Sequence, residues 1–168
     1  GTWSDAATNE DIEGNEQLVS QHYYPPNPNM IGLIGTANGF LAGFWENKVG
    51  FSEPYQPHAW PPEYVKIFDY PIVALATYGT TIVVFTTGYT YLVDGIDPRN
   101  LSVARVPDIY PCVSKQSVSS GDRGVYYACD VGLGFVGSGG VQIVTKDLMD
   151  EDDWQVWKPA TMHGTVFD

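Results

Sequence analysis

The sequence has few basic residues, and it contains no long apolar run. Eight Lys and Arg stand against twenty Asp and Glu, which gives a formal net charge of −12. We therefore expect no specific binding of nucleic acid, because phosphate contacts depend on Lys and Arg. No apolar run approaches the roughly 20 residues that a membrane-spanning helix needs, so we expect no membrane partner either.

Cysteine is also scarce, since the chain has only Cys112 and Cys129. Two cysteines are too few for a disulfide framework, although they could pair across adjacent strands of one sheet. We expect instead that both thiols are free and partly buried, in a chain that folds in a reducing cytosol.

Sequence motifs for metal binding and catalysis are missing as well. The three histidines, His22, His58 and His163, do not have zinc-ligand spacing with one another or with a Cys. The acidic residues within 147–153 lack the ligand spacing of an EF-hand and indicate a solvated helix start. We therefore predict no catalytic, cofactor-binding or metal-binding residue, and we expect His58 to serve packing and hydrogen bonding. A catalytic pair of glycosidase carboxylates remains an open alternative, because the separation of two carboxylates depends on the fold.

One glycine pattern has the spacing of a nucleotide-binding motif. Residues 132–137 match G-x-G-x-x-G, which binds a dinucleotide only where it follows a strand and opens a helix. Here Ser138, Gly139, Gly140 and a further apolar run follow. The pattern therefore predicts the glycines of a β-hairpin.

The stretch at residues 72–94 contains three short runs of apolar, β-branched and aromatic residues. The runs 72–76, 81–86 and 89–93 are separated by turns that contain glycine. Runs of this length between such turns predict antiparallel strands joined as a meander. No window in this stretch has the length or the 3.6-residue period of a helix.

The same order of runs and turns occurs three times. Residues 33–52 align without a gap with residues 75–94 at an offset of 42, which places Leu33 on Leu75. A third copy follows at an offset of 43, which places Leu75 on Val118. Each copy also has a fourth extended run, and these runs are 64–68, 101–106 and 141–145.

Four antiparallel strands in units of about 40–45 residues are typical of β-propeller blades. The sequence therefore predicts an all-β fold of about three blade-like units in a single domain or fragment that spans residues 1–168. The predicted units are 30–68, 71–106 and 112–145, with equivalent second strands at 41–45, 82–86 and 125–128. An ordinary sandwich or barrel, which also has short strands and regular turns, stays open as an alternative.

The segments outside these units are expected to be a short helix and parts of further units. Residues 146–157 contain Asp and Glu early in the segment, which suit a helix N-terminus. Residues 160–167 are expected to start a fourth unit, and residues 17–22 to end a preceding one. Because closed propellers have about four to eight blades, three units do not close a ring. We expect a fragment of a longer protein, with copies that complete one another or an open stack as alternatives.

Several stretches of the sequence resemble a family of tailed-phage and prophage virion structural proteins. The most specific stretch is FSEPYQPHAWP at residues 51–61. The resemblance covers nearly everything from about Met30 to Trp154. The other stretches that carry it are 32–35, 38–44, 91–95, 112–115 and 139–145.

The resemblance implies a component similar to podovirus tail nozzle (tail tubular) proteins, whose folds include β-propeller domains. The chain is then a non-enzymatic structural part of a phage tail or head–tail connector. It would assemble in the bacterial host cytoplasm, reside in the virion, and contact other copies of itself and neighbouring tail proteins. An acidic wall suits passive DNA passage during ejection, since it repels phosphates.

Two other functions remain as hypotheses. A receptor- or glycan-binding β-propeller module would use exposed Trp and Tyr side chains in its loops as contacts. A propeller glycoside hydrolase would need an acid pair, and no pair stands out in the sequence.

Overall fold

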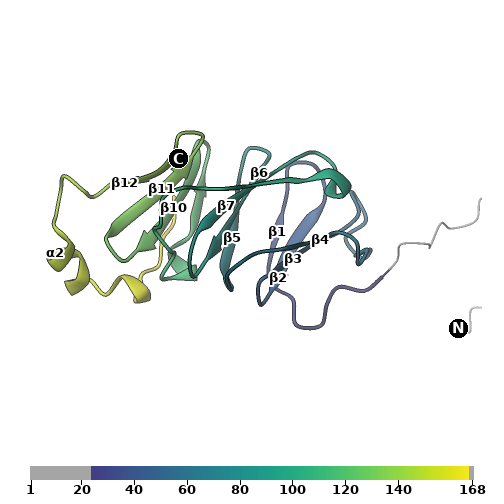
Figure 1. Cartoon of the computed structure of the whole chain (residues 1–168), viewed down its shortest axis with the longest axis horizontal. Helices are drawn as coiled ribbons and strands as arrows, with labels where there is room; N and C mark the ends of the chain where they lie inside the picture. Colours follow the sequence, from purple (N-terminus) through teal and green to yellow (C-terminus); the bar gives the residue numbers. More distant parts are fainter. Residues whose placement is uncertain (1–23, 167–168) are drawn as a thin grey trace, which may run out of the picture.

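The computed structural model describes residues 24–166, and they form three four-stranded antiparallel sheets (Figure 1). The first sheet contains β1 (Ile31–Gly35), β2 (Leu41–Trp45), β3 (Lys48–Phe51) and β4 (Val65–Ile67). The second sheet contains β5 (Ile72–Tyr78), β6 (Thr81–Thr86), β7 (Thr90–Asp94) and β8 (Ser102–Arg105). The third sheet contains β9 (Ser119–Gly121), β10 (Gly124–Cys129), β11 (Gly132–Gly137) and β12 (Gly140–Ile143). Each sheet is a meander in chain order, which confirms the predicted all-β fold of three four-strand units.

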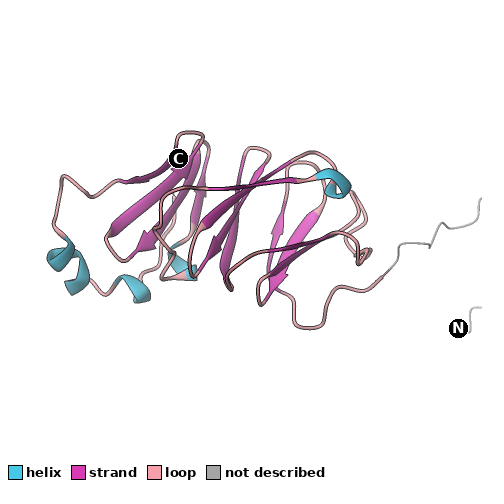
Figure 2. Cartoon of the chain, viewed as in Figure 1, coloured by secondary structure: helices cyan, strands magenta, loops and turns pink. Residues whose placement is uncertain are grey.

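The three sheets are stacked in a row, with the second sheet in the middle (Figure 2). Strand β6 shows how the middle sheet is buried on both faces. Ile82 and Val84 pack into the core against the first sheet. Val83 and Phe85 pack into the core against the third sheet. The uninterrupted apolar run of β6 follows from this burial, because successive side chains of a strand point to opposite faces.

Aromatic side chains fill both cores between the sheets. Phe68, which follows β4, meets Tyr91 of the second sheet edge-on, with ring centroids 5.0 Å apart. In the other core, Phe85 and Tyr127 lie with ring centroids 4.6 Å apart. Rings in such tilted or edge-on arrangements add to the stabilisation from burial.

The first strands of the three sheets lie next to one another, since β1 contacts β5 and β5 contacts β9. We call these three strands the inner strands. Neighbouring blades of a propeller are arranged in the same way around their axis. The sheets are therefore blade-like in both their topology and their stacking.

The gapless offset of 42 residues holds only for the first strands. Ala42 of β2 and Val83 of β6 both face the next sheet along the chain, so they are the structural equivalents. Their strand partners, Ile34 and Ala76, are also equivalent. The second strands therefore correspond at an offset of 41, because the first hairpin loop is one residue longer than its counterpart. A slip of one residue in a strand reverses every side chain.

The offset of 43 residues between the second and third sheets is consistent with the structure. It places Val83 on Tyr126. It also places the residues that pair with Val83 on its two neighbouring strands onto the residues that pair with Tyr126. The predicted second strands 41–45, 82–86 and 125–128 thus occupy equivalent positions in the three sheets, and only the gapless offset of 42 is one residue too long for the first two.

The helix near the C-terminus is shorter than predicted. It is α2 (Glu151–Val156), and Asp150 is its N-cap, because the Asp150 side chain accepts a hydrogen bond of 2.9 Å from the Asp153 backbone N–H. The prediction that residues 146–150 are helical is wrong, since the cap begins the helix after them. The 3₁₀ helices are η1 (Pro98–Asn100), η2 (Lys115–Ser117) and η3 (Pro159–Thr161).

The strand expected at residues 160–167 is not formed within the described part of this segment. After η3 the chain runs beside residues 114–117. The Gly164 N–H donates to the Gln116 carbonyl at 3.0 Å, and the Ser114 hydroxyl donates to the Met162 carbonyl at 2.8 Å. The expected strand at 17–22 lies outside the described residues. No helix in residues 24–166 has the length and apolar character needed to cross a bilayer.

Candidate functional site

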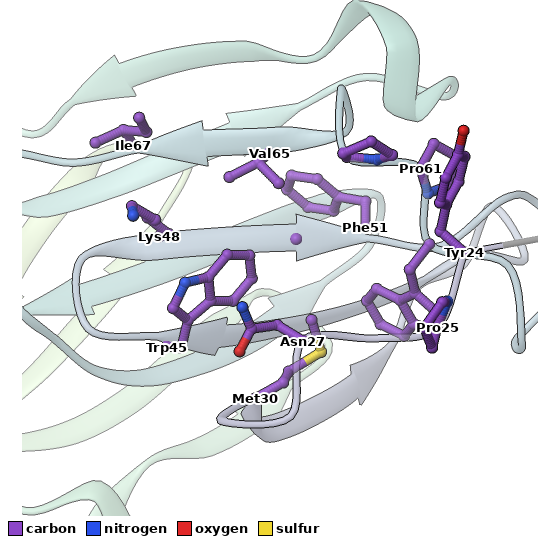
Figure 3. Close-up of a pocket in the computed structure, with 13 residues that line it drawn as sticks. Tyr24, Pro25, Asn27, Met30, Trp45, Lys48, Phe51, Pro61, Val65 and Ile67 are labelled. Carbon is purple, nitrogen blue, oxygen red and sulfur yellow. The ribbon is translucent and has the colours of Figure 1, made fainter. Parts of the chain in front are cut away.

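A groove of about 600 Å³ lies on the outer face of the first sheet, the face turned away from the second sheet (Figure 3). Strands β2, β3 and β4 form its floor. The segment 24–30 and the loop that leads into β4 form its walls. We call this hollow the outer groove. Its lining residues are Tyr24, Pro25, Asn27, Met30, Trp45, Lys48, Gly50, Phe51, Trp60, Pro61, Pro62, Val65 and Ile67.

The outer groove exists because two facing floor positions have no side chain. Gly43 and Gly50 are opposite one another in the β2–β3 pair, and Val65 is opposite Gly50 on β4. Their equivalents in the second sheet are Val84 and Tyr91, which are also cross-strand partners and are both buried. Side chains therefore fill the corresponding position in the middle sheet, whereas the first sheet is left hollow.

Two neighbouring side chains lie across these glycines. A Cβ atom at Gly43 would stand 2.6 Å from the Met30 sulfur, and one at Gly50 would stand 3.0 Å from the Trp45 ring. Because the Trp45 ring comes so close to the backbone at Gly50, it lies along the floor of the groove. Trp45 is only half-buried, so part of its indole surface is open to a ligand.

Proline and aromatic residues close one end of the groove. Tyr24, Pro25 and Pro61 stand together there (Figure 3). The Trp60 backbone N–H donates to the Tyr24 carbonyl at 2.8 Å, and the Trp60 indole N–H donates to the Pro57 carbonyl at 2.9 Å. The first bond ties the segment 24–30 to the proline-rich loop, and the second holds the Trp60 side chain within that loop. Of Tyr24, 47% stays exposed.

The electrostatics of the groove contrast with those of the whole chain. Lys48 is the one charged residue among the described residues that line it. Lys48 stands between Trp45 and Ile67 in a cross-strand row, and it has no ion pair with any carboxylate in residues 24–166. The Asn27 Oδ1 accepts the Asn29 N–H at 2.9 Å. The site is therefore apolar and aromatic, with one cation and one amide.

A second surface feature lies on the inner strand of the first sheet. Ile31 and Leu33 of β1 are 56% and 59% exposed. Together with Val73 of β5, they line a hollow of about 310 Å³ whose polar edge is Lys115 and Gln116. We call this surface the inner-strand patch. Apolar side chains gathered in this way are typical of an interaction surface.

The first and second sheets are also joined by a polar cluster. The Tyr64 hydroxyl donates to Glu53 Oε1 at 2.9 Å, and the Arg99 Nε–H donates to the Tyr64 oxygen at 2.7 Å. Arg99 also lies 3.8 Å from the Glu53 carboxylate. Burial raises the pKa of Tyr64, and the hydrogen bond to Tyr64 raises the pKa of Arg99. This cluster satisfies a buried carboxylate and fixes the loop that carries Trp60.

Both thiols are free, as predicted, but both are buried, so the expectation of partial burial is wrong. Cys112 and Cys129 belong to the core between the second and third sheets. Burial raises the pKa of Cys112 to about 12, and it raises the pKa of Cys129 as well. Because the thiolate is the reactive form, burial lowers the reactivity of both side chains in the folded protein.

Among residues 24–166, the other residues considered from the sequence do not gather into a site. His58 is exposed, whereas its neighbours Ala59 and Trp60 are buried. His22 lies outside the described residues. The glycine pattern at 132–137 forms β11 of a hairpin, as predicted. Within the part of the chain that the structure describes, no three His, Cys, Asp or Glu residues are grouped to hold a metal ion.

The outer face of the third sheet has a hollow of its own, of about 620 Å³. Tyr126 and Phe135 lie side by side there, with ring centroids 4.8 Å apart. Asp122 and Arg123 contribute opposite charges to the lining.

No family model matches the chain, and no curated protein sequence matches it.

Proposed function

We propose that the chain is a non-enzymatic structural component of a phage tail or head–tail connector. It acts through contacts with other copies of itself and with neighbouring tail proteins, resides in the virion and assembles in the bacterial host cytoplasm. The observation that carries the proposal is the inner-strand patch on a stack of three blade-like sheets.

The patch supports an assembly role because its side chains are exposed at a position that propellers normally enclose. Ile31 and Leu33 belong to the inner strand of the first sheet, and inner strands face the axis of a ring. An apolar surface at that place becomes buried when further blades close the ring or when a neighbouring protein binds at the axis. The free energy of burying these side chains then stabilises the assembly.

The charge of the chain is compatible with the passage of DNA. With a net charge of −12, the surface repels phosphates instead of holding them. A tail component of this kind would let DNA slide past during ejection without retaining it.

The test is the location and copy number of the protein in infectious particles. Particles released from the bacterial strain that carries the coding sequence are purified by density gradient, and an antiserum against the chain is used for quantitative blotting. We expect a fixed number of copies per particle. Detection of the protein only in the particle-free part of the lysate would contradict the proposal.

A pair of variants links that result to the patch. Leu33→Asp is expected to lower the copy number in particles, because a carboxylate at an apolar interface opposes association. Ile96→Asp, in the exposed loop between β7 and β8, is the matched control and should leave the copy number unchanged. Equal incorporation of both variants would show that the inner-strand patch is not the interface.

A further inference from the structure

We infer that the outer groove binds a glycan whose sugar residues carry carboxylate groups, such as an oligosaccharide that contains uronic or sialic acids. This inference goes beyond the assembly role, which depends on the inner-strand patch. The two surfaces lie on different parts of the first sheet, so either function can fail without the other.

The aromatic rings of the groove suit sugar rings. The flat indole of Trp45 lies along the floor over Gly50, and Tyr24 stands at the end of the groove with Pro61 (Figure 3). The faces of pyranose rings present C–H groups that pack against an aromatic surface, and a mostly apolar hollow with a few polar groups is the usual form of a ligand site. The groove can therefore hold a short chain of sugars between Trp45 and Tyr24.

Lys48 supplies the preference for an acidic sugar. Its side chain is half-buried beside Trp45 and Ile67, and no described residue lining the groove is an Asp or a Glu. A carboxylate that enters the groove would give Lys48 an ionic partner, which it lacks within residues 24–166. The Asn27 amide, also in the lining, offers N–H groups to sugar hydroxyls.

The floor of the groove argues against an extended peptide as the ligand. Strand β3 is hydrogen-bonded to β2 on one side and to β4 on the other. Its backbone is therefore already paired, and it has no free edge to which a peptide could add as a further strand. The free edge of this sheet at the groove is β4, so a ligand over β2 and β3 meets side chains and a backbone that is already paired, which suits stacking and side-chain hydrogen bonds.

The walls of the groove argue against a second copy of the chain. The segment 24–30 already crosses this face, and Met30 occupies the space above Gly43. A second sheet needs an approach of about 10 Å to pack face to face, and this segment stands in its way. Nucleic acid is also disfavoured, because the groove offers a single cation in a chain of net charge −12.

The experiment compares matched oligosaccharides on the full chain. The probes are tetragalacturonic acid and a sialic acid tetramer, and the neutral counterparts are the methyl ester of the first and maltotetraose. Binding is measured by titration calorimetry and by the change in Trp fluorescence. We expect at least one acidic tetramer to bind about fivefold or more tightly than the neutral tetramers, as for an ion pair of about 1 kcal/mol.

Variants of the groove separate the two contributions. Lys48→Gln should remove the preference for the acidic tetramer, whereas Lys66→Gln, on the opposite face of the same sheet, should keep it. Trp45→Ala should weaken binding of acidic and neutral tetramers alike by about tenfold, and Trp157→Ala, at an exposed site after α2, should not. Far-ultraviolet circular dichroism is recorded for each variant to establish that it is folded.

Three outcomes would overturn the inference. The first is that neither acidic tetramer binds, and the second is that acidic and neutral tetramers bind equally. The third is that Trp45 becomes shielded from a fluorescence quencher as the protein concentration rises, in step with self-association seen by light scattering, which would show that a second copy fills the groove.

Discussion

Val83 offers a direct test of the stacked-sheet core. Its side chain is 0% exposed and lies between the second and third sheets. Val83→Ala removes two buried methyl groups, which at about 0.8 kcal/mol each gives about 1.6 kcal/mol from transfer alone. The cavity left between two fixed sheets raises the expected loss to about 2–3 kcal/mol in the free energy of unfolding.

The loss is measured by thermal and urea denaturation. For a chain of this length, about 2–3 kcal/mol corresponds to a fall in Tm of roughly 4–12 °C. The matched control is Val103→Ala in β8, where the side chain is 44% exposed and the expected change is within about 0.5 kcal/mol. If both variants melted at the same temperature, Val83 would not lie between packed sheets.

Val83→Asp is the stronger form of the same perturbation. An unpaired carboxylate at this position adds several kcal/mol to the lost apolar burial. The sum is comparable with the whole stability of a domain, about 5–15 kcal/mol, so we expect no cooperative transition at neutral pH. A melt close to that of the unchanged chain would show that the side chain reaches water and that the strand faces are assigned wrongly.

Three further predictions follow from polar and titrating groups in the cores. Glu53→Gln should lower the free energy of unfolding in urea by about 1–2 kcal/mol, because it weakens the buried cluster with Tyr64. Burial, with the hydrogen bond to Asp69, raises the pKa of Tyr91 to about 12. Since that value exceeds the unfolded one, Tyr91 should contribute a fall in stability between about pH 10 and 12, and Tyr91→Phe should make the alkaline fall of the chain shallower. Cys112 and Cys129 should resist iodoacetamide until urea unfolds the chain, as read by mass spectrometry.

The strands were predictable because their signals are local. Short apolar runs between glycine-containing turns define the hairpins whatever the rest of the chain does. The faces of those strands were not predictable in the same way. Ile82 and Val83 are both apolar and both fully buried, so composition alone does not say which one meets the first sheet and which one the third.

The register between the repeats was also not predictable from the sequence. A single extra residue in the hairpin loop between β1 and β2 shifts the second strands by one position, and the shift exchanges the two faces. Identities between the copies are too few to reveal such a gap. Only the contacts show that Ala42 corresponds to Val83.

The outer groove was not predicted from the sequence, although part of its floor can be recognised there. Gly43, Trp45, Lys48 and Gly50 occupy the alternate positions of β2 and β3 that point away from the second sheet. Two glycines beside a Trp and a Lys at such positions indicate a hollow with an aromatic wall. The rest of the site comes from the segment 24–30, and its position across the sheet is a tertiary feature that no local pattern encodes.

The two ends of the stack bear on how the protein would assemble. An outermost blade without a neighbour would leave one face of its sheet open. Yet Met30 and the segment before it cross the outer face of the first sheet. At the third sheet, η3 contacts β10, and Val166 lines the hollow beside Tyr126. Each end face is thus partly covered by the chain itself.

That covering changes where an interface is to be sought. A further blade stacked on either end face would first have to displace a segment that is already packed there, and the loss of those contacts opposes such stacking. Association at the inner-strand patch displaces no packed segment, because Ile31 and Leu33 are already exposed. Association through the inner strands should therefore be less sensitive to Met30→Ala than to Leu33→Asp. Equal loss of association in both variants would instead indicate stacking through the first sheet's outer face.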